Sequence, residues 1–240
     1  MTIERQTIIY DGPGGPFEGV IVRDLDWDQP RPAVMVLPNV LGQKEADNVR
    51  AEQLAALGYV GFAVDVYGQG KRTTRQSPDP AVHMNELNAN RPLLCDRLHN
   101  ALKVLEERPE VDKGRMAAIG FCFGGKCVLD LARTGANLRG VVSFHGVYDR
   151  PPFPNIAPIR SRVLICHGWD DPLCPPDATV GLAKELTEAG ADWQLHAYGH
   201  TGHAFTDESA NMPERGVVYQ PESERRSWQA MTNFLAEIFR

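Results

Sequence analysis

The sequence predicts an α/β fold with a mostly parallel sheet, and two observations support this prediction. Short apolar runs rich in β-branched residues alternate along the chain with longer segments of helical character. Such alternation is typical of right-handed βαβ crossovers, which cover a parallel sheet with helices on both faces. The run at 33–37, AVMVL, is apolar throughout, as expected of a strand that is buried on both faces.

The first half of the chain begins with a predicted antiparallel hairpin. Two strand-forming runs, 7–10 and 17–23, flank the Gly- and Pro-rich turn 11–16. A helix at 45–57 is expected to stop before Gly58, because glycine is common just past a helix end. The other predicted elements of this half are strands at 33–37 and 59–66, a loop at 67–80, and helices at 82–90 and 92–108.

The second half continues the same alternation. Asp177 is the expected N-cap of a helix at 177–189, and Gly190 lies past its end. The proline-rich segment 149–158 is expected to be an irregular surface loop. The remaining predicted elements are strands at 140–144, 162–166 and 193–198 and a closing helix at 222–239.

Length and composition limit the function. We expect one domain over residues 1–240, because the sequence contains no linker, repeat or low-complexity tract. The net charge of −6 argues against nucleic acid as a main partner. No apolar run approaches the ~18 residues of a membrane span. Five cysteines without a C-x-x-C pair, and an N-terminus without an apolar leader, indicate a reducing, cytoplasmic location.

The most informative stretch is RMAAIGFCFGGKC at 115–127, which predicts a strand, a sharp turn and a helix. Cys122 lies at the turn between Gly120 and Gly124, as a strained backbone corner requires. The pattern is the G-x-S-x-G nucleophile elbow of α/β-hydrolases with cysteine in place of serine. The thiol would sit at a helix N-terminus, where the helix dipole favours the thiolate. The alternative is a chance turn around a structural cysteine.

A nucleophile of this kind requires a base and an acid, and two later strand ends supply candidates. In this fold the acid and then the histidine follow the nucleophile along the chain. One strand is followed by HGWDDPL, where we predict Asp171 as the acid and keep Asp170 as the alternative. The next strand is followed by GHTGHAF. There we predict His203, at a solvent-near loop position, as the base, and keep His200 as the alternative.

The predicted chemistry is nucleophilic catalysis through a thioester. His203 would take the proton of Cys122 or form an imidazolium–thiolate pair with it, and Asp171 would orient the imidazole. The tetrahedral intermediate needs two backbone N–H donors. We predict that these belong to Phe123, directly after the nucleophile, and to Val40, in the loop after the AVMVL strand.

These motifs resemble the dienelactone hydrolase family of α/β-hydrolases over nearly the whole chain. The resemblance is carried by the segments PNVLG, GFCFGG, WDDPL and GHAF. It implies an α/β-hydrolase fold, with an N-terminal antiparallel hairpin and helices on both faces of the central sheet. It also implies activity on ester bonds, a Cys122–Asp171–His203 triad, and an oxyanion hole at Phe123 and Val40.

Two positions depart from the family's pattern. Asn39 stands where the resemblance implies a glutamate that helps to release the thiolate, and an amide cannot take up a proton. Asp207 stands where it implies an arginine that holds the substrate carboxylate, and an acid there would repel an anion. We therefore expect neutral esters or lactones as substrates. The alternative carboxylate-binding residues are Arg72, Arg75 and Arg91.

Other site features are predicted from residue type and position. His145, directly after the strand at 140–144, is expected to be buried and hydrogen-bonded, and a polar supporting role near the site is the alternative. Neither metal-ligand spacing nor a cofactor-binding loop is present, so no metal or cofactor is expected. The expected partner is a small-molecule ester or lactone, and the expected assembly is a monomer or homodimer. The predicted substrate-binding residues are Asn39, Tyr67, Trp169 and Phe205, and the segments that could cover the site are 67–80 and 149–158.

The sequence leaves several functions open. The first is an ester or lactone hydrolase whose activity extends to activated esters such as aryl esters and phosphotriesters. The second is a catalytically weak redox-sensing or binding protein on the same scaffold, since an exposed thiolate oxidises readily. A dienelactone hydrolase with rearranged carboxylate recognition, and a thioesterase or acyltransferase, are the further alternatives.

Overall fold

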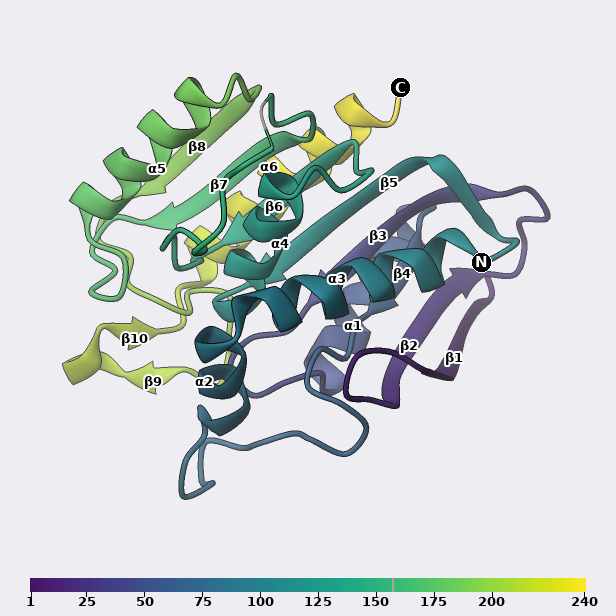
Figure 1. The fold of residues 1–240 in the computed structure, drawn as a ribbon, viewed down its shortest axis with the longest axis horizontal. Coiled ribbons are helices and arrows are strands. Elements are labelled where there is room, and N and C mark those ends of the chain that lie inside the picture. Colours follow the sequence, from purple (N-terminus) through teal and green to yellow (C-terminus); the bar gives the residue numbers. More distant parts are fainter. Residues whose placement is uncertain (157) are drawn as a thin grey trace. The chain divides into compact units, whose positions relative to one another are not determined.

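A computed structural model describes residues 1–156 and 158–240 (Figure 1). Its internal contacts divide the chain into two units, Met1–Ala118 and Ile119–Arg240. The chain passes from the first unit to the second within strand β5, Val111–Phe121. One domain over residues 1–240 stays a prediction.

The N-terminal unit begins with the predicted hairpin. Strands β1, Ile3–Tyr10, and β2, Phe17–Asp24, pair antiparallel in a register that places Tyr10 opposite Phe17. Strand β2 then pairs antiparallel with β4, Val60–Ala63, which pairs parallel with β3, Arg31–Leu37. The strand order in this unit is β1-β2-β4-β3-β5.

The helices of this unit begin and end close to the predicted residues. Helix α1 packs on β4, where the Cβ of any residue in place of Gly61 would lie 2.5 Å from the carbonyl oxygen of Ala51. Strand β4 is shorter than predicted, because Asp65 turns the chain by accepting hydrogen bonds from the N–H groups of Tyr67 and Gly68 at 2.9 and 3.0 Å. The helices are α1, Glu45–Ala56, α2, Val82–Ala89, and α3, Arg91–Glu106.

The C-terminal unit is built on three parallel strands. Strand β6, Gly140–Phe144, pairs with β7, Arg162–Gly168, and β7 pairs with β8, Trp193–Tyr198. Helix α4, Phe123–Arg133, packs on β6, and every one of its residues is buried. Helix α6, Pro221–Ile238, packs on β6 and β7. In Figure 1, α4 lies in front of these strands and α6 behind them.

Two features of this unit differ from the prediction. Helix α5, Pro176–Glu188, has Pro175 as its N-cap, and Asp177 lies in its first turn. The predicted Asp177 cap was wrong because proline, with its fixed φ and missing N–H, starts the helix one residue earlier. A small antiparallel pair, β9 at Asn211–Met212 and β10 at Val217–Val218, was not predicted. The 3₁₀ turn Pro213–Arg215 joins its strands.

None of the helices in the described ranges combines the length and the apolar character that a bilayer crossing requires.

Candidate active site

The predicted elbow is present at the end of β5. Cys122 is the N-cap of α4 and has φ 55° and ψ −110°, a backbone conformation that residues other than glycine rarely adopt. Its N–H donates to the carbonyl oxygen of Phe144 at 3.0 Å, which ties the corner to the end of β6. A Cβ at position 120 would overlap the carbonyl group of Gly124, so only glycine fits there. The local sequence is therefore what this turn requires.

Cys122 differs from the other cysteines in its exposure. The other four cysteines, Cys95, Cys127, Cys166 and Cys174, are buried. Cys122 is of intermediate exposure and is the N-cap of α4. The first N–H groups of a helix have no partner within the helix, and they favour negative charge at its N-terminus. It is the accessible thiol among the cysteines of the chain.

Asp171 and His203 form a close, buried pair. His203 Nδ1 lies 2.7 Å from Asp171 Oδ2, and the two residues are 3% and 1% exposed. The other carboxylate oxygen of Asp171 accepts the N–H of Leu173 at 2.8 Å, which leaves Oδ2 for the imidazole. The expectation that His203 lies near solvent was wrong, because the loop after β8 folds back into the interior.

The remaining ring nitrogen of His203, Nε2, is buried without a well-aligned hydrogen-bond partner. Burial by itself would lower the pKa of His203, but the nearby Cys122 and the hydrogen bond with Asp171 outweigh it and raise this pKa to about 10. The cationic imidazole is thus favoured beside the sulfur. Such an arrangement can hold an imidazolium–thiolate pair, or return a proton to a leaving group.

The alternative acid and base lie elsewhere. His200 is fully exposed, and its Nδ1 is 3.8 Å from Oδ2 of the half-exposed Asp170. Both residues face water, whereas Asp171 and His203 are buried. The buried combination has the fixed geometry that a catalytic pair needs.

The main chain of His203 is held by the pair β9–β10. Its N–H donates to the carbonyl oxygen of Gly216 at 2.8 Å, and its own carbonyl oxygen accepts the N–H of Val218 at 3.1 Å. Gly202 allows this close approach, since a Cβ there would overlap the Gly216 carbonyl group. Sequence reasoning missed this support, and the glycines at 202 and 216 are the signal that could have indicated it.

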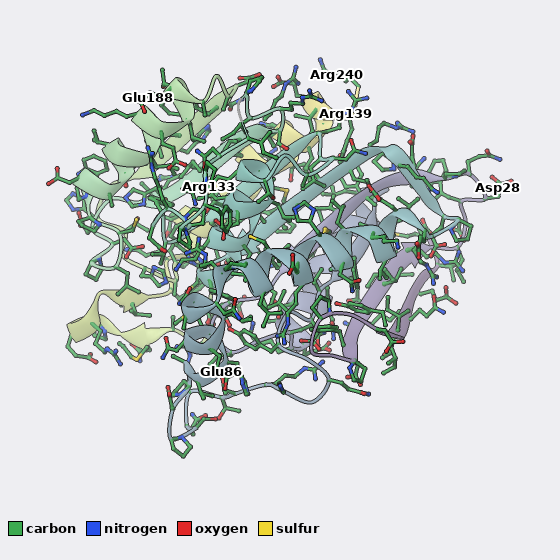
Figure 2. The ribbon with its side chains drawn as sticks, viewed as in Figure 1. Asp28, Glu86, Arg133, Arg139, Glu188 and Arg240 are labelled. Carbon is green, nitrogen blue, oxygen red and sulfur yellow. The ribbon has the colours of Figure 1, made fainter. Side chains whose placement is uncertain are left out.

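The loop that follows β6 is tied to α4. Arg133, at the end of α4 and labelled in Figure 2, donates to the carbonyl oxygens of Tyr148 and Asp149 at 3.2 and 3.4 Å. The same buried guanidinium makes two 2.9 Å hydrogen bonds to Glu185 of α5. Lys126 of α4 also pairs with Asp149 at 2.7 Å. Residue 157, within the segment predicted to cover the site, lies outside the described residues.

Two predicted pocket residues belong to the C-terminal unit. Trp169 is 42% exposed, and its ring meets that of His167 edge-on at 6.2 Å. Phe205 has no exposed surface, and its ring packs edge-on against those of His145 and Tyr198. Phe205 therefore supports the interior of the site rather than offering a surface.

The other predicted site residues fall in both units. Phe123 begins α4, so its N–H is the first of the helix. In the N-terminal unit, the hydroxyl of Tyr67 donates to the Val40 carbonyl oxygen at 3.1 Å, and Asn39 Oδ1 accepts the N–H of Leu41 at 3.0 Å. These bonds fix the turn that carries Asn39 and Val40.

A metal site is not formed by the residues of the described ranges, since they contain no group of three or more His, Cys, Asp or Glu side chains that could hold an ion.

Comparison with known proteins identifies the family of the chain. The sequence model of the dienelactone hydrolase family matches residues 17–239. The solved structure named m3DLH is 37% identical, covers 100% of both chains and has a TM-score of 0.93. A dienelactone hydrolase-like promiscuous phosphotriesterase from metagenomic libraries is 33% identical, also covers 100% of both chains and has a TM-score of 0.90.

One of the curated relatives is named as a probable lactonase. The Bradyrhizobium protein named "Probable 2-oxo-3-(5-oxofuran-2-ylidene)propanoate lactonase" is 25% identical over 206 residues, which cover 82% of this chain and 80% of that protein. The family match, the α/β-hydrolase fold and these relatives together establish the class of the molecule. The chain belongs to the dienelactone hydrolase family and is a hydrolase of ester bonds.

Proposed function

We propose that the chain hydrolyses neutral carboxylic esters or lactones through Cys122, His203 and Asp171, by way of a thioester on Cys122. The observation that carries the proposal is the buried 2.7 Å contact between His203 and Asp171 beside a thiol that helps to raise the pKa of His203 to about 10. A raised imidazole pKa favours the charged pair, in which the sulfur is a ready nucleophile.

In the proposed mechanism, the thiolate attacks the carbonyl carbon and forms the C–S bond. The carbonyl oxygen becomes an oxyanion, which the N–H groups of Phe123 and Val40 would bind. The His203 imidazolium then gives its proton to the departing alkoxide as the C–O bond breaks. In the second half, neutral His203 takes a proton from water, whose oxygen displaces the thiolate from the thioester. Asp171 stabilises the imidazolium in both halves.

The preference for neutral substrates follows from residue 207. Asp207 lies four residues after His203, in the same turn, and its side chain accepts hydrogen bonds from the N–H and hydroxyl of Ser209. A carboxylate held there disfavours an anionic substrate group. Activated esters, including aryl esters and phosphotriesters, are proposed as secondary substrates, because the same nucleophile and oxyanion donors suit them and a relative is named a promiscuous phosphotriesterase.

Substitution of the three residues tests the proposal. With p-nitrophenyl acetate as substrate, Cys122→Ala and His203→Ala should each lower kcat by at least about 10³-fold, since both supply reacting groups. Cys122→Ser should be nearly as inactive, because a hydroxyl ionises far less easily than a thiol. Acyl-enzyme on Cys122 should be detectable by mass spectrometry after rapid quenching.

The matched control is His200→Ala, which removes the exposed histidine three residues before His203. This variant should keep wild-type kcat. A loss of activity in His200→Ala, or full activity in Cys122→Ala, would contradict the proposed triad. A folded wild-type protein that hydrolyses no ester, lactone or phosphotriester while its thiol oxidises readily would favour the redox-sensing alternative.

A further inference from the structure

A second buried histidine lies against the proposed base. His145 is 1% exposed and directly follows β6. Its ring centroid is 5.2 Å from that of His203, and the two rings meet edge-on at 69°. The proposed mechanism gives His145 no task, so its position beside the base calls for an explanation.

The His145 side chain is held by the turn that carries His203. Its Nε2 shares a 2.7 Å hydrogen bond with the hydroxyl of Thr206, which is 7% exposed. Phe205 packs on the same ring, at a centroid distance of 5.0 Å and an angle of 80°. The base, the hydroxyl of Thr206 and the ring of Phe205 thus come from four consecutive residues, 203–206.

The backbone of His145 is fixed as firmly as its ring. Its N–H donates to the carbonyl oxygen of Cys166 at 2.9 Å, and the carbonyl oxygen of the preceding residue, Phe144, accepts the N–H of Cys122. On its other side, Gly146 lies so close to α4 that a Cβ on Gly125 would be 2.7 Å from the Gly146 Cα. One short segment therefore contacts the nucleophile's corner and the base's ring.

His145 also has a strained backbone, with φ 38°. A residue other than glycine is strained in this region, because its Cβ approaches the neighbouring carbonyl oxygen. Strain of this kind persists only where the surroundings impose it, and it gathers at functional sites. Glycine, which would relieve the strain, would lose both the ring contact with His203 and the bond to Thr206.

We propose that His145 is a positioning residue, whose ring, tied to Thr206 and backed by Phe205, holds the His203 imidazole in the orientation that directs Nε2 to Cys122. This inference rests on the proposed function. The titratable groups that act on His203 are Cys122, Asp171 and His167.

The test measures the Cys122 thiolate directly, without turnover. The pH dependence of thiolate absorbance and of alkylation by iodoacetamide is compared in wild type, His145→Ala, His145→Phe and Thr206→Val, after subtraction of the Cys122→Ala signal. The matched control is His196→Ala, an exposed histidine of β8. Circular dichroism and thermal melting establish that each variant is folded.

His145→Ala should move the midpoint of thiolate formation to higher pH and lower kcat about 10- to 100-fold, since a small misplacement of a catalytic group has this cost. KM should change far less than kcat. Thr206→Val, which keeps the shape but removes the hydroxyl, should shift the midpoint in the same direction by less. His145→Phe, which keeps an aromatic ring, should fall between His145→Ala and wild type, and the control should match wild type.

Folded His145→Ala with the wild-type midpoint and kcat would overturn the inference. If that variant does not fold, Thr206→Val decides, and a wild-type midpoint in it would also overturn the inference. The proposed function fails by a different result, namely full esterase activity in Cys122→Ala. The thiolate measurements need no turnover, so the two failures can be told apart.

Discussion

At the scale of single residues, backbone strain marks the candidate site. Among the described residues other than glycine, φ is positive at Cys122, His145, His200 and Ala204. The first is the proposed nucleophile, the second contacts the ring of the base, and the last two flank the base in its loop. Local folding preferences alone would avoid all four conformations. Their concentration around one imidazole indicates that the surrounding packing serves the geometry of that group.

A residue-scale prediction concerns the alkaline limit of activity. The hydrogen bond with Asp171 helps to raise the pKa of His203 to about 10, so kcat/KM should fall as the imidazolium deprotonates above that pH. Asp171→Asn removes this contribution, and the alkaline limb should move to lower pH with a loss of kcat. Profiles of kcat/KM against pH for both proteins measure the shift. An unchanged or higher alkaline limb in Asp171→Asn would contradict the assignment.

At the scale of elements, the sequence predicted the strands and helices that an apolar pattern or a helix-end residue marks. The strands at 140–144 and 193–198 were placed to the residue, and the helix after Cys122 was expected. The buried Asp171–His203 contact joins residues that the sequence placed at two successive strand ends. The pair β9–β10 could not be predicted, because two-residue strands show no alternation. Beside their own pairing, β10 and Gly216 hydrogen-bond to the His203 main chain.

An element-scale prediction tests that support. Gly202→Ala would place a Cβ against the Gly216 carbonyl group and push β10 away from His203. Overpacking of this kind costs about 1–3 kcal/mol of unfolding free energy, and kcat should fall because the base loses its main-chain support. Gly199→Ala is the matched control in the same loop, since nothing lies within 4 Å of its added Cβ. Denaturant titrations and kcat measurements compare the two, and equal effects would refute the proposed support.

At the scale of the whole molecule, charge acts on substrate choice. The net charge of −6 disfavours the approach of anions over a distance set by ionic strength. The screening length shrinks from about 30 Å at 0.01 M salt to about 8 Å at 0.15 M. A general repulsion is therefore weakened by salt. A carboxylate beside the bound substrate acts at short range, where salt screens much less, so the two contributions can be separated.

The last prediction uses that difference. For an anionic dienelactone, kcat/KM should be lower than for a neutral aryl ester, and salt should recover only part of the gap. Asp207→Asn should raise kcat/KM for the anionic substrate and leave the neutral one unchanged. Glu208→Gln, at the adjacent exposed position, changes the net charge by the same amount. It should raise kcat/KM for the anionic substrate only by weakening the general repulsion, as added salt does. Equal kcat/KM for both substrates in wild type, or equal effects of the two substitutions, would show that Asp207 does not select substrate charge.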